Sequence, residues 1–174
     1  MGILYLVGAR ASGKTTVGKT LAQKLGLPFA DTDQHLLESA GRTVDQIVEA
    51  EGWPGFRQRE SAALREVTDA HSDCVVSTGG GMVLAEENRT RMRQHGMVVF
   101  LDAPVDVLAE RLGRNPLSSQ RPSLTGKGQV EEISDVLNER HPLYEAAAHH
   151  VVDASRPLQS ICRHIADLWK KHAV

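Results

Sequence analysis

The chain has 174 residues, of which 41% are hydrophobic and 24% charged, a composition that suits one compact globular domain with a full core. Its 20 basic residues are balanced by 22 acidic ones, so we expect no binding to nucleic acid or to an anionic membrane. No apolar run approaches the roughly 18 residues that cross a bilayer, and Cys74 and Cys162 lie in apolar runs, which together predict a cytoplasmic protein with reduced thiols in its core.

Short apolar runs predict buried β-strands, and patterns with helical spacing fill the intervals between them. The predicted strands are residues 3–7, 27–30, 74–78, 97–102 and 149–153. The predicted helices lie near residues 14–25, 55–70, 84–96, 129–147 and 158–169, with two short helices before residue 55 and another after Pro104. The second short helix begins at a capping box of Thr43 and Gln46. This alternation predicts an α/β fold, with helices on both faces of a parallel sheet.

One segment departs from this alternation. Residues 113–128 contain two prolines, three serines and three glycines, and they have almost no apolar periodicity. A loop of this length inside a compact domain is either functional or disordered, and the composition alone leaves both interpretations open.

The segment GARASGKT, residues 8–15, matches the phosphate-binding pattern G-x-x-x-x-G-K-[ST] between a predicted strand and a predicted helix. Gly8 and Gly13 let the backbone turn its N–H groups inward, toward phosphate oxygens at the positive end of a helix. Lys14 can reach the β- and γ-phosphates of a nucleotide, and the Thr15 hydroxyl can ligate Mg²⁺. The expected ATP-binding residues of this loop are Gly8, Ala11, Ser12, Gly13, Lys14, Thr15 and Thr16.

The acidic residue that supports the metal ion must come from another part of the chain. The D-x-x-G and N-K-x-D motifs of GTPases do not occur, and the third predicted strand ends at Ser77 without the acid that motor ATPases carry there. Asp31, at the end of the second predicted strand, is the candidate, together with Thr15. Asp33 follows two residues later, and because alternate residues of an extended chain face one side, we expect both carboxylates to face the same cleft.

Six blocks of sequence carry a family resemblance. GARASGKTTVG, DTD, GFRQRE, STGGG, RPSLTG and ERHPLY occur in the order and spacing of the shikimate kinases. The chain resembles that family over essentially its whole length, and the form GWPGFRQRE is most similar to the type II bacterial members. The resemblance implies a three-layer P-loop kinase fold with strand order 2-3-1-4-5. It implies one domain over residues 1–174, with substrate-binding helices near 33–62 and a mobile lid near 113–128.

The resemblance also implies an activity. The γ-phosphate of ATP would be transferred to the 3-hydroxyl of shikimate, giving shikimate 3-phosphate and ADP in the biosynthesis of chorismate and the aromatic amino acids. ATP and shikimate are the expected partners, Mg²⁺ is the expected cofactor, and the protein is expected to be a monomer.

The acceptor-binding residues carry over position by position. Arg57 and Arg140 match the arginines that bind the carboxylate of shikimate, and a planar guanidinium suits that task. Asp33 matches the acid that contacts the hydroxyl to be phosphorylated, and we expect it to orient that hydroxyl and take its proton. Three consecutive glycines, Gly79, Gly80 and Gly81, end the third strand at the edge where α/β proteins bind ligands, and they permit close approach of the backbone.

The nucleotide-binding residues outside the P-loop rest on the resemblance alone. Arg121 matches the lid arginine that reaches the transferred phosphate, where a cation would act with Lys14 on the developing charge. Arg111, Arg156 and Pro157 match the region that holds the adenine ring.

Helical spacing gives Arg140 and Glu60 support that does not depend on the family. Their apolar stripes consist of Ile133, Leu137 and Tyr144 for Arg140, and of Phe56, Ala63 and Val67 for Glu60. A charge on an inward face is costly unless it is paired, so we expect Glu60 to fix the geometry of Arg57. The alternative is that each charge lies at the edge of its stripe and reaches water. Trp53 and Phe56 could form an apolar wall or ordinary core.

Two other functions remain open at this point. The chain could be another small-molecule kinase of the same fold, such as a gluconate kinase or a nucleotide kinase. It could also be an ATP-binding module without turnover, although the intact set of Lys14, Thr15, Asp31, Asp33 and Arg121 argues against that.

Overall fold

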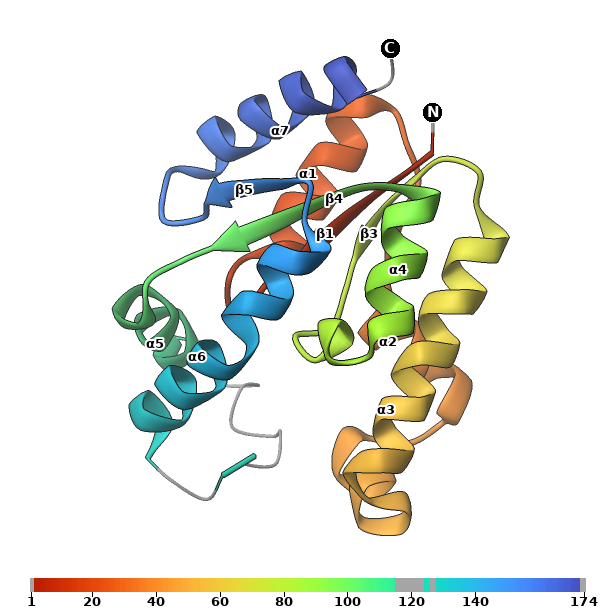
Figure 1. Ribbon diagram of the computed structural model, residues 1–174, viewed down its shortest axis with the longest axis vertical. Helices are drawn as coiled ribbons and strands as arrows, with labels where there is room; N and C mark the ends of the chain where they lie inside the picture. The colour runs from red at the N-terminus through yellow and green to blue at the C-terminus, as the bar shows by residue number, and fades with distance from the viewer. Residues whose placement is uncertain (1, 115–123, 126–127, 173–174) are drawn as a thin grey trace.

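The computed structural model describes residues 2–114, 124–125 and 128–172. Within this part of the chain, five parallel strands form one sheet in the order β2-β3-β1-β4-β5, which confirms the order that the resemblance implies (Figure 1). The strands are β1 (Ile3–Val7), β2 (Phe29–Asp31), β3 (Cys74–Ser77), β4 (Gly96–Asp102) and β5 (His150–Asp153). All residues of the central strand β1 are buried, as the continuous apolar run of a strand covered on both faces predicts.

Helices cover both faces of the sheet and complete three layers (Figure 1). They are α1 (Lys14–Leu25), α2 (Thr32–Ala40), α3 (Val44–Ala70), the 3₁₀ turn η1 (Met82–Leu84), α4 (Glu86–His95), α5 (Val105–Arg114), α6 (Gln129–Ala147) and α7 (Leu158–His172). Leu6 packs in one core with Leu21 of α1 and Ile165 of α7. Val76 packs in the opposite core with Leu64 of α3, beside residues of α4 and α6. Alternate strand residues therefore fill two cores from the same short runs.

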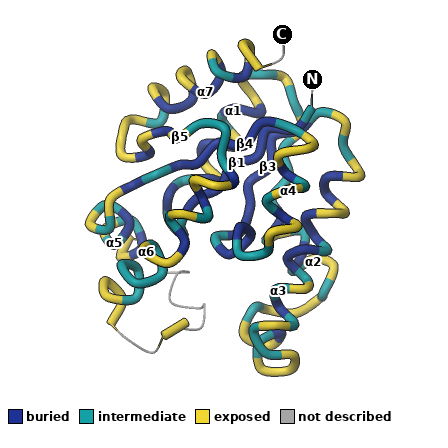
Figure 2. Tube along the Cα trace, in the orientation of Figure 1, coloured by how far each residue is buried: buried dark blue, intermediate teal, exposed yellow. Residues whose placement is uncertain are grey.

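A third, smaller core lies where α2 meets α3, beyond the carboxyl ends of the strands. It consists of Leu36, Ile47, Phe56 and Ala63. In Figure 2 the central strands β1, β3 and β4 are almost entirely buried, whereas this α2–α3 extension is exposed on its outer side. The α2–α3 extension is therefore stabilised by its own small core. It lies at the carboxyl edge of the sheet, where β1 leads into the P-loop.

The helix α3 consists of the two predicted helices, joined at a sharp break. It begins at Val44, after the capping box of Thr43 and Gln46, and it includes both the second short helix and the helix expected over residues 55–70. Gly52 interrupts it with φ 69° and ψ 177°. Side chains disfavour a positive φ, so glycine is what permits two helical arms to join at this angle. The helical period restarts after the break, which is why the pattern suggested two elements.

Both cysteines are buried in the core, as predicted. Burial raises the pKa of the Cys74 thiol to about 11, so this thiol stays protonated at neutral pH. Among the helices of residues 2–114, 124–125 and 128–172, none is long and apolar enough to pass through a bilayer.

A buried hydrogen bond between β1 and α3 gives a prediction about stability. The Tyr5 hydroxyl lies 2.9 Å from Thr68 Oγ1, and both residues are buried. Thr68→Val leaves the Tyr5 hydroxyl without this partner, so the free energy of unfolding should fall by about 1–3 kcal/mol. Adding Tyr5→Phe should recover part of the loss, since no orphaned hydroxyl remains. Urea unfolding of both single variants and the double variant measures the coupling, and strictly additive losses would contradict it.

Candidate active site

The P-loop connects β1 to α1 along a path that side chains would obstruct. A Cβ on Gly8 would lie 2.7 Å from the Leu101 carbonyl oxygen, and Gly13 has φ 97°. The Lys14 ammonium group donates to the carbonyl oxygens of Gly8 and Ala9, each at 2.8 Å. The Lys14 side chain therefore folds back onto the loop and holds it closed. It is buried, with 8% exposure.

A cavity of about 340 Å³ opens above this loop, and we call it the phosphate cavity. Lys14, Thr15 and Thr16 line it from the P-loop and α1, and Asp31 and Asp33 line it from the end of β2 and the start of α2. Backbone N–H groups, a lysine and two carboxylates in one concave space fit a phosphate with its metal counter-ion.

The two aspartates face the same cavity, as expected, but they do not lie on one extended segment. Asp31 ends β2 and caps α2: its Oδ1 accepts from the backbone N–H groups of Asp33 at 3.0 Å and Gln34 at 3.2 Å. Helix capping by the first aspartate turns the chain before the second is reached. Asp33 therefore lies in the first turn of α2.

Asp31 also faces the P-loop. Its Oδ2 accepts a hydrogen bond of 2.9 Å from the Thr15 hydroxyl, and the Ser77 hydroxyl lies 3.4 Å from the same Thr15 oxygen. No group of three or more His, Cys, Asp or Glu side chains with metal-binding geometry occurs among the described residues. The donors gathered here are a carboxylate and two hydroxyls, a hard oxygen set that suits Mg²⁺ with several of its waters retained.

A second cavity, of about 470 Å³, lies between the α2–α3 extension, the glycine turn at residues 79–81 and α6, and we call it the acceptor cavity. Its apolar wall is formed by Val44, Trp53, Phe56, Ile133, Val136 and Leu137. Its charged lining is formed by Arg10, Asp33, Arg57, Glu60, Glu132 and Arg140. Trp53 and Phe56 pack edge to face with ring centroids 5.7 Å apart, and Phe56 also belongs to the small α2–α3 core. The two interpretations of these aromatic residues are thus both correct.

Asp33 lines both cavities, together with Arg10, Gly80 and Leu112. The two cavities therefore meet at one carboxylate. A group bound in the acceptor cavity would face the phosphate cavity across Asp33.

Arg57 is held on three sides. Its Nη1 donates to Glu60 Oε2 at 2.5 Å, and its guanidinium carbon lies 5.3 Å and 5.5 Å from the ring centroids of Trp53 and Phe56. Glu60 is only 3% exposed, and this burial raises the pKa of its carboxyl group, an effect that the nearby Arg57 opposes. A buried carboxylate that faces a half-buried guanidinium group fixes the orientation of Arg57.

Arg140 is buried at 9% exposure on the inner face of α6. Its Nε is buried and has no hydrogen-bond partner among the described residues. An unpaired buried donor on a cation is costly, and an anionic ligand in the acceptor cavity would satisfy it.

The glycine turn is packed against the same charged groups. A Cβ on Gly79 would lie 2.6 Å from Asp33 Oδ1 and 2.9 Å from Glu60 Oε1, and a Cβ on Gly81 would lie 1.9 Å from Arg57 Nη1. The backbone of this turn is also tied down, since the Tyr144 hydroxyl donates to the Gly80 carbonyl oxygen at 2.7 Å. Burial raises the pKa of Tyr144 to about 12, so this donor stays protonated.

The remaining predicted residues are spread more widely. Arg111 lines the phosphate cavity, and it donates to the carbonyl oxygens of Ser12 at 3.2 Å and Ala154 at 2.7 Å. Arg156 is exposed beside Asp153, and neither Arg156 nor Pro157 is among the described residues that line the two cavities. Arg121 lies outside the described residues, as do residues 115–123 and 126–127 of the expected lid.

Sequence reasoning overlooked two residues that the site uses. Arg10 occupies a variable position of the P-loop pattern, which gave no signal, yet it lines both cavities. Tyr144 was assigned only to an apolar stripe, although a tyrosine at the buried end of such a stripe usually has a partner for its hydroxyl.

A profile of the shikimate kinase family matches residues 10–170. The chain belongs to the shikimate kinase family. It is 54% identical over 162 residues to shikimate kinase 2 of Yersinia enterocolitica, covering 93% of this chain and 92% of the relative. It is 53% identical over 170 residues to shikimate kinase 2 of Syntrophotalea carbinolica, covering 98% of each. Membership of this family identifies the protein as an ATP-dependent kinase.

Solved structures support the same assignment. A shikimate kinase from Acinetobacter baumannii, in complex with shikimate, superimposes with a TM-score of 0.88 at 34% identity over 97% of this chain and 92% of that chain. A gluconokinase from Sinorhizobium meliloti superimposes with a TM-score of 0.59 at 22% identity over 98% of this chain and 94% of that chain, which indicates a common fold alone. The predicted family and the predicted fold are therefore confirmed.

The glycine turn gives a prediction about acceptor binding. Gly81→Ala would place a methyl group 1.9 Å from Arg57 Nη1, so the guanidinium must move. Since a displacement of about 1 Å at a reacting site can cost up to 10²-fold, we expect the KM for the acceptor to rise about 10- to 100-fold while the KM for ATP stays unchanged. Steady-state kinetics measures both. Gly26→Ala, after α1 and outside both cavities, is the control: a Cβ there meets nothing within 4 Å, and its φ of 68° should lower stability without changing either KM. Equal kinetics for the two variants would contradict the prediction.

Proposed function

We propose that this protein transfers the γ-phosphoryl group of ATP to the 3-hydroxyl of shikimate, giving shikimate 3-phosphate and ADP, and that residues 1–174 act as a single domain. The observation that carries the proposal is the meeting of the phosphate cavity and the acceptor cavity at Asp33. The 34% identity to a shikimate kinase solved with shikimate supports the choice of acceptor.

The carboxylate of shikimate is assigned to Arg57 and Arg140. The unpaired Nε of Arg140 and the fixed guanidinium of Arg57 are suited to an anion that enters from the cavity. The apolar wall at Trp53 and Phe56 suits the face of the shikimate ring. The glycine turn is assigned to the hydroxyl groups of shikimate through Gly80 and Gly81, which line the cavity, whereas the Gly79 N–H donates to Thr32 Oγ1 at 3.2 Å.

Asp33 is assigned to orient the acceptor hydroxyl and to take its proton. Lys14 would exchange its two carbonyl partners for phosphate oxygens when ATP binds, at little cost in geometry because the loop is already formed. The transition state of phosphoryl transfer is loose, so positioning carries much of the catalysis. The role of Arg121, neutralisation of the transferred phosphoryl group, rests on the resemblance.

Mg²⁺ is assigned to Thr15 and Asp31, whose oxygens form the hard donor set described above. When bound, the ion would neutralise charge on the β- and γ-phosphates of ATP. Arg111, Arg156 and Pro157 are assigned to the adenine end of the nucleotide, residues 113–128 to a lid, and the active form to a cytoplasmic monomer, all on the strength of the resemblance.

The proposal predicts which acceptor supports turnover. ADP release should be fast with shikimate and close to the acceptor-free background with gluconate or AMP, because two arginines and an apolar wall fit a carboxylate on a small ring. A coupled assay with each acceptor at equal concentration measures this. Turnover with gluconate and not with shikimate would favour another kinase of the same fold.

The two aspartates should differ in their response to metal. Asp33→Asn should lower kcat by about 10²–10⁴, the usual contribution of a general base, without changing the Mg²⁺ dependence. Asp31→Asn should raise the Mg²⁺ concentration needed for half-maximal rate, and excess metal should restore part of the activity. Titration of rate against Mg²⁺ tests both, with Asp106→Asn on the outside of α5 as the control. Equal rescue of both variants, or of neither, would refute this division of roles.

A further inference from the structure

The acceptor cavity depends on a broken helix. α3 changes direction at Gly52, where φ is 69°. Trp53, Phe56 and Arg57, which line the cavity, follow directly after the break, whereas Val44 lines it from the arm before the break. The angle between the two arms therefore decides how far the aromatic wall and Arg57 lie from the rest of the cavity.

An ion pair with fork geometry spans this break. Arg59 Nε donates to Glu51 Oε2 at 2.8 Å, and Arg59 Nη2 donates to Glu51 Oε1 at 2.7 Å. Glu51 is the last residue before Gly52, and Arg59 lies in the second turn of the arm that follows. Two parallel hydrogen bonds define both a distance and an orientation, which a single contact does not.

The glycine at position 55 leaves room for this ion pair. A Cβ on Gly55 would lie 2.5 Å from the Cβ of Glu51, so a side chain at position 55 would push the glutamate away from the second arm. Arg42 Nη1 lies 3.6 Å from Glu51 Oε1 and adds a further positive charge. Glycine at one position, and cations on both sides of Glu51, hold the carboxylate across the break.

The pair and the cavity lie on opposite sides of one helical turn. Residues two apart on an α-helix point about 200° from each other, so Arg59 faces outward while Arg57 faces the cavity. A rotation of the second arm would move both guanidinium groups together. The ion pair that holds Arg59 on the outer face of the helix therefore also fixes the position of Arg57 in the cavity.

We propose that Glu51 and Arg59 are positioning residues for the acceptor site: their bidentate pair sets the angle of α3 at Gly52 and so places Arg57, Trp53 and Phe56 to receive the acceptor. The proposal rests on the proposed function, because it concerns the same cavity. Neither residue touches the cavity, so both act through the helix.

Thermal stability should hardly respond to loss of the pair. The side chains of Glu51 and Arg59 are 29% and 39% exposed, and exposed ion pairs contribute little to the free energy of folding. Binding of the acceptor should respond, since a small change in the angle at Gly52 moves Arg57. A change in KM without a change in Tm separates the positioning role from a structural one.

The test uses Glu51→Gln, Arg59→Gln and the double variant. Each single variant should raise the KM for shikimate about two- to fivefold, because the shift in binding cannot exceed what an exposed ion pair contributes. The KM for ATP should stay unchanged. The double variant should be no worse than either single variant, because the same interaction across the break is lost in all three. The contact of Arg42 with Glu51 lies before Gly52 and does not link the two arms. Arg59→Lys keeps the charge but loses the fork, so it should recover only part of the affinity.

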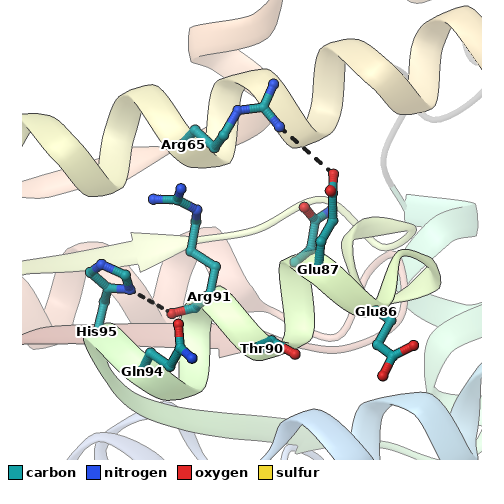
Figure 3. Close-up of a pocket in the computed structure, with 8 residues that line it drawn as sticks. Arg65, Glu86, Glu87, Thr90, Arg91, Gln94 and His95 are labelled. Atoms are coloured by element: carbon teal, nitrogen blue, oxygen red, sulfur yellow. Dashed lines mark hydrogen bonds and ion pairs between the residues drawn. The ribbon is translucent and has the colours of Figure 1, made fainter.

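The same helix supplies a matched control. Arg65, further along α3, pairs with Glu87 of α4 at 3.7 Å in a groove of about 510 Å³, away from the acceptor cavity (Figure 3). Arg65→Gln and Glu87→Gln should leave the KM for shikimate unchanged. If the Glu51 and Arg59 variants shift the KM no more than these controls, or if the double variant shows the product of the single effects, the proposal is overturned.

A readout without substrate separates this proposal from the proposed function. Trp53 adjoins the break and is half-buried, whereas Trp169, the other tryptophan, is 4% exposed. Acrylamide quenching of the ligand-free protein should therefore report on Trp53 and increase equally in both single variants and the double variant. Increased quenching, with no phosphorylation of shikimate by the unmodified protein, would refute the proposed function and leave the positioning role standing. Unchanged quenching would overturn the positioning role.

Discussion

Both cavities exist because β1 and β3 end side by side. Leu6 of β1 pairs with Ser77 of β3, and Thr78 continues this contact by donating to the Leu6 carbonyl oxygen through its backbone N–H at 3.2 Å and its hydroxyl at 2.9 Å. Directly after β1 the chain forms the P-loop, and after Thr78 the chain that follows β3 forms the glycine turn. Parallel pairing therefore brings a phosphate-binding loop against an acceptor-binding turn, as the carboxyl edge of a parallel sheet generally does for ligands.

The charged groups at this edge are tolerated because each is opposed by another. Glu60 is almost fully buried, and Arg57 and Arg140 lie near enough to favour its charged form. Asp31 is stabilised by backbone N–H groups at the start of α2 and by the Thr15 hydroxyl. The exception is the Nε of Arg140, which has no hydrogen-bond partner among the described residues. One unpaired guanidinium nitrogen in an otherwise paired set makes Arg140 the side chain for which an anionic ligand contributes most.

The layers followed from a local pattern, the alternation of short apolar runs with helical spacing, whereas the strand order came from the family resemblance. The P-loop needs its glycines and lysine in a fixed order, and the inward positions of Arg140 and Glu60 follow from helical spacing. The helical backbone at Asp33 did not follow, since capping by Asp31 depends on where β2 ends. The two arms of α3 were predicted as separate helices, but their direct junction at Gly52 was not, because a positive φ at one glycine leaves no periodic pattern in the sequence. Arg10 lines both cavities because segments distant in sequence come together around it in the fold. No residue spacing predicts that.

The glycine turn restricts how this site could change during evolution. A Cβ on Gly79 would clash with Asp33 and Glu60, and a Cβ on Gly81 would clash with Arg57, whereas a Cβ on Gly80 would make ordinary contacts of 3.5–3.8 Å. A mutation that adds a side chain at either end of the turn therefore disturbs a binding group before it can offer a new contact. A new acceptor specificity would need paired substitutions, in which an arginine or an acid is shortened as a glycine is replaced. The backbone of this turn therefore limits the shape of the acceptor that the cavity can bind. Proteins that keep the turn are restricted to acceptors that fit against it.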